Sequence, residues 1–189
     1  MLEELVLLDR ELFLFLNNLG TESWDGFWMT VTNKWFSIPV YLILLILLYR
    51  YLGWKKTLVV LVTVALLITV TDQLANFFKY GVQRLRPCHD EDLIGSFRLV
   101  KKSCGGRFAF YSAHAANSFA LATLFALIFK SRNRAISILI LFWAALVAYS
   151  RIYIGVHFPL DIICGMLSGL LFGWLFYKLH IFIMHKFQL

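Results

Sequence analysis

Charged residues are scarce in this sequence of 189 residues. Only 15% are Asp, Glu, Lys or Arg, whereas 60% are hydrophobic and 17% are aromatic. Charged residues make up about a quarter of an ordinary soluble domain, so this composition argues against a soluble protein. The hydrophobic residues also form long blocks instead of being scattered. We therefore expect an integral membrane protein.

The sequence also lacks linkers, low-complexity tracts and internal repeats, which predicts a single domain over residues 1–189. The N-terminus has no basic leader and begins with several acids, so we expect no cleavable signal peptide. A formal net charge of +7 would suggest nucleic acid as the partner of a soluble protein. In a membrane protein, basic residues instead anchor helix ends to anionic headgroups or bind phosphate. We expect the lipid bilayer and a membrane lipid as partners, and no nucleic acid; protein partners are unknown.

Five hydrophobic stretches are long enough to cross a bilayer, because roughly 20 helical residues span its ~30 Å core. They cover about residues 35–52, 57–79, 110–129, 135–151 and 159–177. Residues 2–19 are predicted to form an interfacial amphipathic helix or a short further span, within an interfacial segment over 1–34. The predicted fold class is all-α, an integral membrane helical bundle of about five to six transmembrane helices including this N-terminal helix.

Alternate crossing would place the polar segments on two sides of the membrane. The turns at 53–56 and 130–134 and the C-terminal tail share one side, and the loop 80–108 and the turn 151–158 share the other. The first side carries no acid, and its basic residues are Arg50, Lys55, Lys56, Lys130, Arg132, Arg134, Lys178 and Lys186. The positive-inside rule favours that side as cytoplasmic. The second side is then expected to face the periplasm or cell exterior, in a bacterial inner membrane.

Residues suited to phosphate chemistry gather on this second side. They are Lys79, Arg86, Ser112, His114, Arg151, His157 and Asp161. Lysine and arginine neutralise phosphate oxygens, and guanidinium groups match them with paired hydrogen bonds. Ser112 and the free backbone N–H groups at a helix start add neutral donors. Taken singly, Lys79 has a plainer interpretation as a headgroup anchor, and Ser112 or His114 as a helix cap.

The spacing of His157 and Asp161 predicts a contact between their side chains. Asp161 follows His157 by four residues, which is close to one helical turn, and the intervening Pro159 is favoured at a helix start. The carboxylate can therefore hold one ring nitrogen and leave the other free as a base or nucleophile. Together with His114 this gives two histidines, which is what a double displacement at phosphorus requires, since one attacks and the other protonates the leaving oxygen.

Three motifs carry a family resemblance over about residues 55–175, the predicted catalytic core. They read Lys79-x6-Arg86-Pro87, then Tyr111-Ser112-Ala113-His114, then Ser150-Arg151-x5-His157-x3-Asp161. They resemble the signature motifs of the type 2 phosphatidic acid phosphatase family, which includes undecaprenyl-diphosphate and lipid A phosphatases and shares its site with vanadium haloperoxidases. The middle motif departs from the family's Pro-Ser-Gly-His. We expect that departure to affect pocket shape and substrate preference more than the reaction.

The resemblance implies a mechanism and a set of site residues. His157 would attack phosphorus and become a phosphohistidine, Asp161 would hold its other nitrogen, and His114 would protonate the leaving oxygen and then activate water. The phosphate oxygens would be held by Lys79, Arg86, Ser112, Arg151 and the backbone N–H of Ala113. No metal or other cofactor is expected, because cationic side chains supply the charge and no clustered carboxylates suited to magnesium lie at this face.

The predicted function is therefore a metal-independent membrane lipid phosphatase. Undecaprenyl diphosphate is the first choice of substrate, and phosphatidylglycerol phosphate, phosphatidic acid and lipid A 1-phosphate remain open. The alternative from another class is a non-catalytic protein that binds or transports lipid phosphates. Haloperoxidase chemistry is a further alternative that the long apolar spans disfavour.

The sequence leaves two points open, the role of Asp72 and the pairing of Cys88 with Cys104. Asp72 lies seven residues before Lys79 on the same helix face, where it either supports the site or forms a structural hydrogen bond to another helix. Cys88 and Cys104 flank the polar loop, and their spacing leaves open whether they form a disulfide.

Overall fold

A computed structural model describes residues 2–188, which form six α-helices and two short 3-10 turns with no β-strand in this range. The helices are α1 (Leu2–Asn18), α2 (Glu22–Val31), α3 (Lys34–Val82), α4 (Ala113–Phe129), α5 (Arg134–Tyr153) and α6 (Pro159–Lys186). The 3-10 turns Pro87–His89 and Glu91–Leu93 lie in the loop between α3 and α4. The predicted all-α fold class is confirmed.

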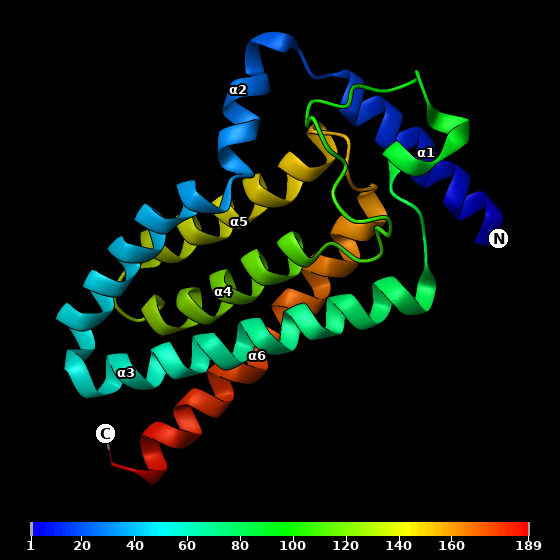
Figure 1. Cartoon of the computed structure of the whole chain (residues 1–189). Helices are drawn as coiled ribbons and strands as arrows, with labels where there is room; N and C mark the ends of the chain where they lie inside the picture. The colour runs from blue at the N-terminus through cyan, green and yellow to red at the C-terminus, as the bar shows by residue number, and fades with distance from the viewer. Residues whose placement is uncertain (1, 189) are drawn as a thin grey trace.

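Helix α3 is broken at Gly53 into two arms. Gly53 has φ 75° and ψ 172°, a conformation that glycine adopts far more easily than other residues. At about 1.5 Å per residue, 49 helical residues in a straight line would be more than twice as long as a ~30 Å bilayer core. Figure 1 shows that the chain instead turns back near Gly53. The predicted polar turn over 53–56 is therefore tighter than expected, because residues 54–56 are helical.

Helix α4 lies in the middle of the bundle, packed against α3, α5 and α6 (Figure 1). Its 17 residues are about 26 Å long, less than a bilayer core. Protein surrounds most of this helix, so its length need not match the lipid. It starts at Ala113 instead of the predicted residue 110, because Ser112 is its N-cap and accepts a hydrogen bond from the backbone N–H of Ala115.

A glycine stripe joins α4 to α6. The stripe is formed by Gly165, Gly169 and Gly173. A Cβ added at Gly169 would lie against the Ala116 carbonyl oxygen and 2.8 Å from the Cβ of Phe119. Small residues at such positions let membrane helices approach closely. The stripe thereby sets the spacing between the helix starts that carry His114 and Asp161.

The lipid-facing surface is a band of exposed hydrophobic side chains. They include Leu42, Ile46, Leu61, Leu66, Ile138, Phe142, Leu167 and Leu171. Helices α3, α5 and α6 are long and apolar enough to span a membrane. The prediction of an integral membrane protein is confirmed. Helix α6 also continues to Lys186, beyond the predicted end of the last span at 177.

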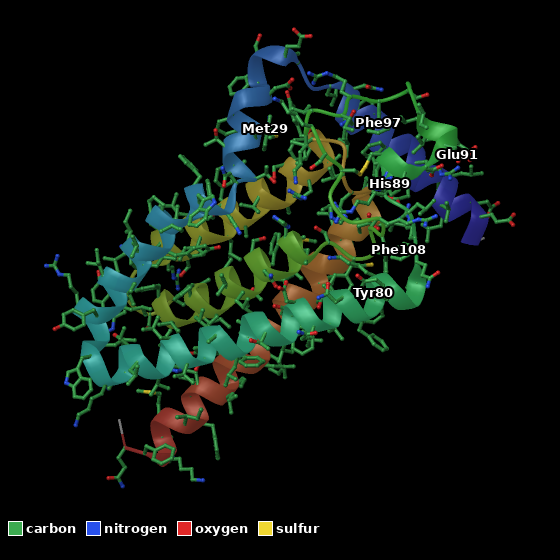
Figure 2. All side chains as sticks on the ribbon, viewed as in Figure 1. Met29, Tyr80, His89, Glu91, Phe97 and Phe108 are labelled. Atoms are coloured by element: carbon green, nitrogen blue, oxygen red, sulfur yellow. A yellow bond between two sulfur atoms is a disulfide. The ribbon has the colours of Figure 1, made fainter. Side chains whose placement is uncertain are left out.

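Helices α1 and α2 lie at the end of the bundle that also holds the α3–α4 loop and the α5–α6 turn (Figure 1). The ring of Phe13 in α1 packs 5.3 Å from Phe97, which lies beside α1 in Figure 2, and 5.2 Å from Phe158. The Gly53 turn, the α4–α5 turn and the C-terminus lie toward the other end. Helix α2 was not predicted, since its tryptophan-rich sequence indicated only a headgroup boundary.

Filling the glycine stripe should destabilise the bundle. Gly169→Val would force α4 and α6 apart, and overpacking of this kind costs about 1–3 kcal/mol. We expect a lower midpoint of thermal unfolding in detergent, or loss of folded protein. Gly26→Ala in α2 is the matched control, because a Cβ at Gly26 would meet nothing within 4 Å. An unchanged unfolding midpoint for Gly169→Val would contradict this packing.

Candidate active site

Six of the eight predicted site residues line one cavity of about 470 Å³. The cavity lies among both arms of α3, α4, α5 and the α5–α6 turn, and the six residues are Lys79, Arg86, Ala113, His114, Arg151 and His157. The other two, Ser112 and Asp161, are fully buried and are not among its lining residues. Residues that are more than 70 positions apart in the sequence thus meet in one site.

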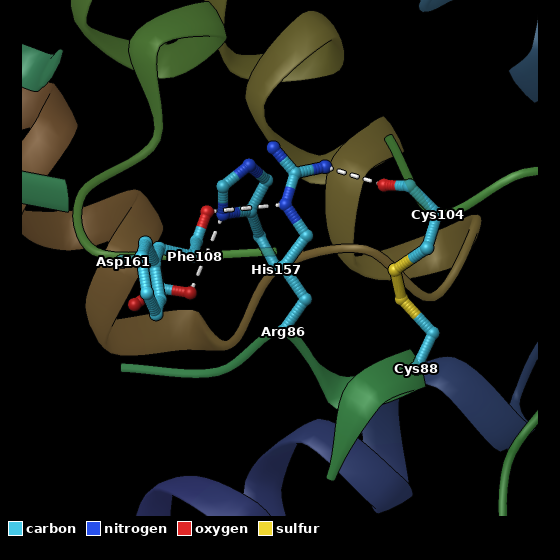
Figure 3. Close-up of a disulfide and its surroundings, with 6 residues drawn as sticks. All are labelled: Arg86, Cys88, Cys104, Phe108, His157 and Asp161. Carbon is cyan, nitrogen blue, oxygen red and sulfur yellow. Dashed lines mark hydrogen bonds and ion pairs between the residues drawn. A yellow bond between two sulfur atoms is a disulfide. The ribbon is translucent and has the colours of Figure 1, made fainter. Parts of the chain in front are cut away.

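His157 lies in the turn before α6 and is only 1% exposed. Its Nδ1 is 3.3 Å from Oδ2 of Asp161, the same oxygen that accepts a 2.9 Å hydrogen bond from the backbone N–H of Phe158 (Figure 3). Burial, together with the positive charges of Arg151, Arg86 and Lys79, holds the pKa of His157 well below its usual range. The imidazole is therefore neutral near pH 7. With Nδ1–H directed at the carboxylate, Nε2 carries a free lone pair.

Arg86 is held by neutral acceptors alone. Its Nη1 donates to the carbonyl of Cys104 at 2.6 Å and its Nε to the carbonyl of Phe108 at 3.2 Å. Figure 3 shows its guanidinium group beside the His157 ring. Gly105, with φ 80°, lets the loop wrap closely around this guanidinium group, since a Cβ there would be 3.0 Å from Nη1.

Arg151 is 3% exposed and makes one side-chain hydrogen bond, from Nη1 to the hydroxyl of Thr32 at 2.6 Å. Its buried Nε has no partner among residues 2–188. A buried N–H without an acceptor is costly, and a bound anion would satisfy it. The orientation of Arg151 therefore suits a phosphate in the cavity.

Basic side chains at the active-site end of the bundle differ in their partners. Arg10, Arg84 and Arg98 each form an ion pair with an aspartate. Across residues 2–188, the structure contains no such ion pair for Lys79, Arg86 and Arg151. Lys79, Arg86 and Arg151, which line the cavity, therefore keep a positive charge that no carboxylate of residues 2–188 pairs with, and this suits a multiply charged anion.

The middle motif contributes His114 and Ala113 to the cavity but not its serine side chain. The hydroxyl of Ser112 caps α4, at 3.4 Å from the N–H of Ala115. The replacement Tyr111 is buried outside the cavity lining, and its hydroxyl lies 3.1 Å from that of Ser168 on α6. The tyrosine therefore braces α4 against α6 and does not narrow the cavity.

A chain of charged residues behind His157 was missed by the sequence analysis. Asp9 of α1 accepts from Arg84 at 2.6 Å and from the backbone N–H of Leu160 at 2.8 Å. Arg84 also donates to Oδ1 of Asp161 at 3.2 Å. The N-terminal helix is thereby tied to the carboxylate that holds His157. Two features of the sequence could have indicated this chain. Asp9 is an acid in an apolar helix, and Arg84 is a second arginine two residues before Arg86.

Two further cations were also missed, Lys34 and Lys101. Both line a cavity of about 300 Å³ that shares His114 and Arg151 with the larger one. Burial and the charges of Arg151 and Arg86 lower the pKa of Lys101. The sequence does not assign Lys101 to the site, because its position does not reveal that the loop folds back over the cavity.

Cys88 and Cys104 form a disulfide, with their Cα atoms 6.1 Å apart. The bond joins the two sides of the loop that surrounds Arg86 (Figure 3). The Cys88, Cys104 and His89 ligand atoms also lie within 4.8 Å of one another. Since the disulfide uses both thiols, this cluster has no thiolate for a metal ion.

Comparison with known proteins gives a family and several relatives. The model of the PAP2 superfamily matches residues 56–184. The lipid A 4'-phosphatase of Bacteroides thetaiotaomicron is 40% identical over 188 residues, which cover 98% of this chain and 81% of that protein. The lipid A 4'-phosphatase of Porphyromonas gingivalis is 36% identical over 96% of this chain and 76% of its own length. An undecaprenyl-diphosphatase of Sulfolobus acidocaldarius is 27% identical over 84% of this chain and 72% of its own length.

Two solved structures share the architecture. The crystal structure of LpxE from Aquifex aeolicus matches with a TM-score of 0.67 and 26% identity, over 90% of this chain and 95% of that chain. A PAP2 type phosphatidylglycerolphosphate phosphatase from Bacillus subtilis matches with a TM-score of 0.72 and 22% identity, over 93% of this chain and 86% of that one. The second likeness concerns the fold alone.

Breaking the chain behind His157 should slow catalysis more than it weakens binding. Asp9→Asn removes the charge that holds Arg84, so Asp161 and His157 lose part of their support. We expect kcat to fall about 10- to 100-fold, with a smaller change in KM, and Asp9→Glu to restore part of the loss. Steady-state phosphate release in detergent measures both constants.

Arg10→Gln is the matched control for this experiment. Arg10 is the next residue on α1 and pairs with Asp90 and Asp92, which have no contact with Asp161. Its loss should leave kcat unchanged. An equal loss of kcat in both variants would mean that α1 acts only through overall stability.

Proposed function

The chain belongs to the PAP2 superfamily and is a membrane lipid phosphatase, and from this premise we propose that it dephosphorylates lipid A through a phosphohistidine on His157. One observation supports the site most strongly. A neutral histidine held by a carboxylate lies among Lys79, Arg86 and Arg151, three cations that have no carboxylate partner in the described chain. The similarity to two lipid A 4'-phosphatases supports the choice of lipid.

In the first step of the proposed mechanism, Nε2 of His157 attacks phosphorus while the bond from phosphorus to the sugar oxygen breaks. Asp161 stabilises the positive imidazole that forms. The three cations stabilise the charge on the equatorial phosphate oxygens, which is the main requirement for phosphoryl transfer. His114 gives its proton to the departing sugar oxygen. An anionic phosphate beside His114 favours the protonated imidazole needed for this role.

In the second step, neutral His114 takes a proton from water, and the resulting hydroxide attacks the phosphohistidine. The phosphorus–nitrogen bond breaks, inorganic phosphate is released, and His157 returns to its neutral form. His114 lines both cavities, so the smaller one, with Lys101 at its wall, offers water a route that the lipid does not occupy. Cationic side chains supply the charge stabilisation at every stage.

Undecaprenyl diphosphate, the first choice from the sequence, becomes the second candidate. Its support is one relative at 27% identity, against two lipid A 4'-phosphatases at 40% and 36%. Lipid A 1-phosphate also stays a candidate, because a lipid A 1-phosphatase of Rhizobium etli is 34% identical over 53% of this chain.

We place the protein in a bacterial inner membrane with the site facing the periplasm. The bacterial sources of both lipid A 4'-phosphatases support the compartment. The acid-free basic turns toward the other end of the bundle support the orientation. A disulfide in the active-site loop fits an oxidising compartment.

Phosphate release by detergent-purified protein, with EDTA present, tests the proposal. The substrates are lipid A, undecaprenyl diphosphate, phosphatidic acid and phosphatidylglycerol phosphate. We expect the highest kcat/KM on lipid A and a loss of at least about 100-fold in His157→Ala and His114→Ala.

His185→Ala is the matched control, because His185 is an exposed histidine near the C-terminus and lines neither cavity. Its activity should match that of the wild type. Phosphate release by His157→Ala at the wild-type rate would overturn the assignment of His157 as the nucleophile. A higher kcat/KM on undecaprenyl diphosphate than on lipid A would overturn the assignment of lipid A as the substrate.

A further inference from the structure

The active-site cavity continues past the cations into the membrane-spanning part of the bundle. Asn76 and Asp72 lie about one and two helical turns before Lys79 on α3, and Asn117 lies about one turn after His114 on α4. All three line the cavity. We call Asp72, Asn76 and Asn117 the polar floor.

An aspartate inside a membrane span is costly unless it faces a polar cavity. Asn117 donates from Nδ2 to Oδ1 of Asp72 at 2.8 Å, and its Oδ1 lies 2.6 Å from the hydroxyl of Thr71. The predicted hydrogen bond from Asp72 to another helix is therefore present. It leaves Oδ2 of Asp72 and the whole amide of Asn76 without a hydrogen-bond partner among residues 2–188. These groups remain available to an occupant of the cavity.

The unused groups restrict the chemistry of that occupant. A hydrocarbon chain against them would remove water from a carboxylate and an amide without replacing its hydrogen bonds, which is unfavourable. A second phosphate would be repelled by the carboxylate of Asp72. A neutral group rich in hydroxyls and amides satisfies both restrictions, because it donates to the carboxylate and exchanges hydrogen bonds with the amides.

The lining changes in a fixed order along the cavity. Along α3, Lys79 is followed by Asn76 and Asp72, and along α4, His114 is followed by Asn117, so the polar floor comes after the charged end of the cavity. Tyr41 and Leu121 then also line a neighbouring apolar cavity of about 310 Å³ between the arms of α3 and α4. The same order, from phosphate to sugar to acyl chain, is found in a phosphorylated glycolipid.

We infer that the polar floor binds the sugar ring that carries the scissile phosphate, and that this contact selects phosphorylated glycolipids over other lipid phosphates. The inference rests on the proposed function, in which the substrate is lipid A. A site built to hydrogen-bond hydroxyl groups discriminates strongly against a ligand that lacks them, since its own polar groups are then left unpaired.

A pair of soluble probes tests the polar floor apart from the lipid. N-acetylglucosamine 4-phosphate and glycerol 3-phosphate carry the same phosphate monoester and differ in the sugar ring. Their dissociation constants are measured by calorimetry on His157→Ala protein in detergent, so that neither probe is turned over. We expect about tenfold tighter binding of the sugar phosphate, and loss of that preference on adding Asp72→Asn or Asn76→Ala.

Gln73→Ala is the matched control. Gln73 is the neighbour of Asp72 on α3, is exposed as Asp72 is, and does not line the cavity. It should keep the tenfold preference. Asn76→Ala changes an exposed side chain that forms no hydrogen bond with residues 2–188, so it stays informative if Asp72→Asn fails to fold.

The outcomes separate the inference from the proposed function. An equal affinity for both probes, or a preference that survives both polar-floor variants, overturns the inference whichever lipid is hydrolysed. Hydrolysis of lipid A is measured in parallel on wild-type protein. A clear sugar preference that depends on the polar floor, with lipid A left intact, supports the inference and overturns only the proposed substrate.

Discussion

Asp161 is the point on which the site converges. Its carboxylate accepts from the backbone N–H of Phe158, contacts Nδ1 of His157 and pairs with Arg84. Its carbonyl accepts from the backbone N–H of Ser112, at the start of α4. One residue therefore fixes the starts of α4 and α6, the histidine between α5 and α6 and, through Arg84 and Asp9, helix α1. The glycine stripe brings α4 and α6 close enough for this arrangement.

The second constraint is the separation of paired and unpaired cations. Arg84 is neutralised by two aspartates and serves to hold structure. Arg86, two residues later, is held by backbone carbonyls and keeps its positive charge for the cavity. Two arginines of one motif thus have opposite electrostatic roles. Anion binding at the cavity depends on an arginine that lines it and is not neutralised by a carboxylate.

Local spacing explains which features the sequence could predict. The contact of His157 with Asp161 spans four residues, and the cap of Ser112 on α4 spans three, so both follow from helix geometry. The pairing of Asp9 with Arg84 spans 75 residues, and the approach of Lys101 to the cavity depends on how a long loop folds. Neither contact has a periodic signal. The helix of α2 was missed because its aromatic residues favour a membrane interface as strongly as a helix.

Trapping the covalent intermediate tests the central claim, that His157 is the nucleophile. Lipid substrate labelled with ³²P is mixed with enzyme, and the reaction is quenched in alkali within milliseconds. The labelled peptide of the enzyme is then identified by mass spectrometry. We predict an alkali-stable, acid-labile phosphohistidine at His157 that forms and decays at rates consistent with turnover. Hydrolysis with inversion of configuration at phosphorus, and no label on His157, would contradict it and indicate direct attack by water.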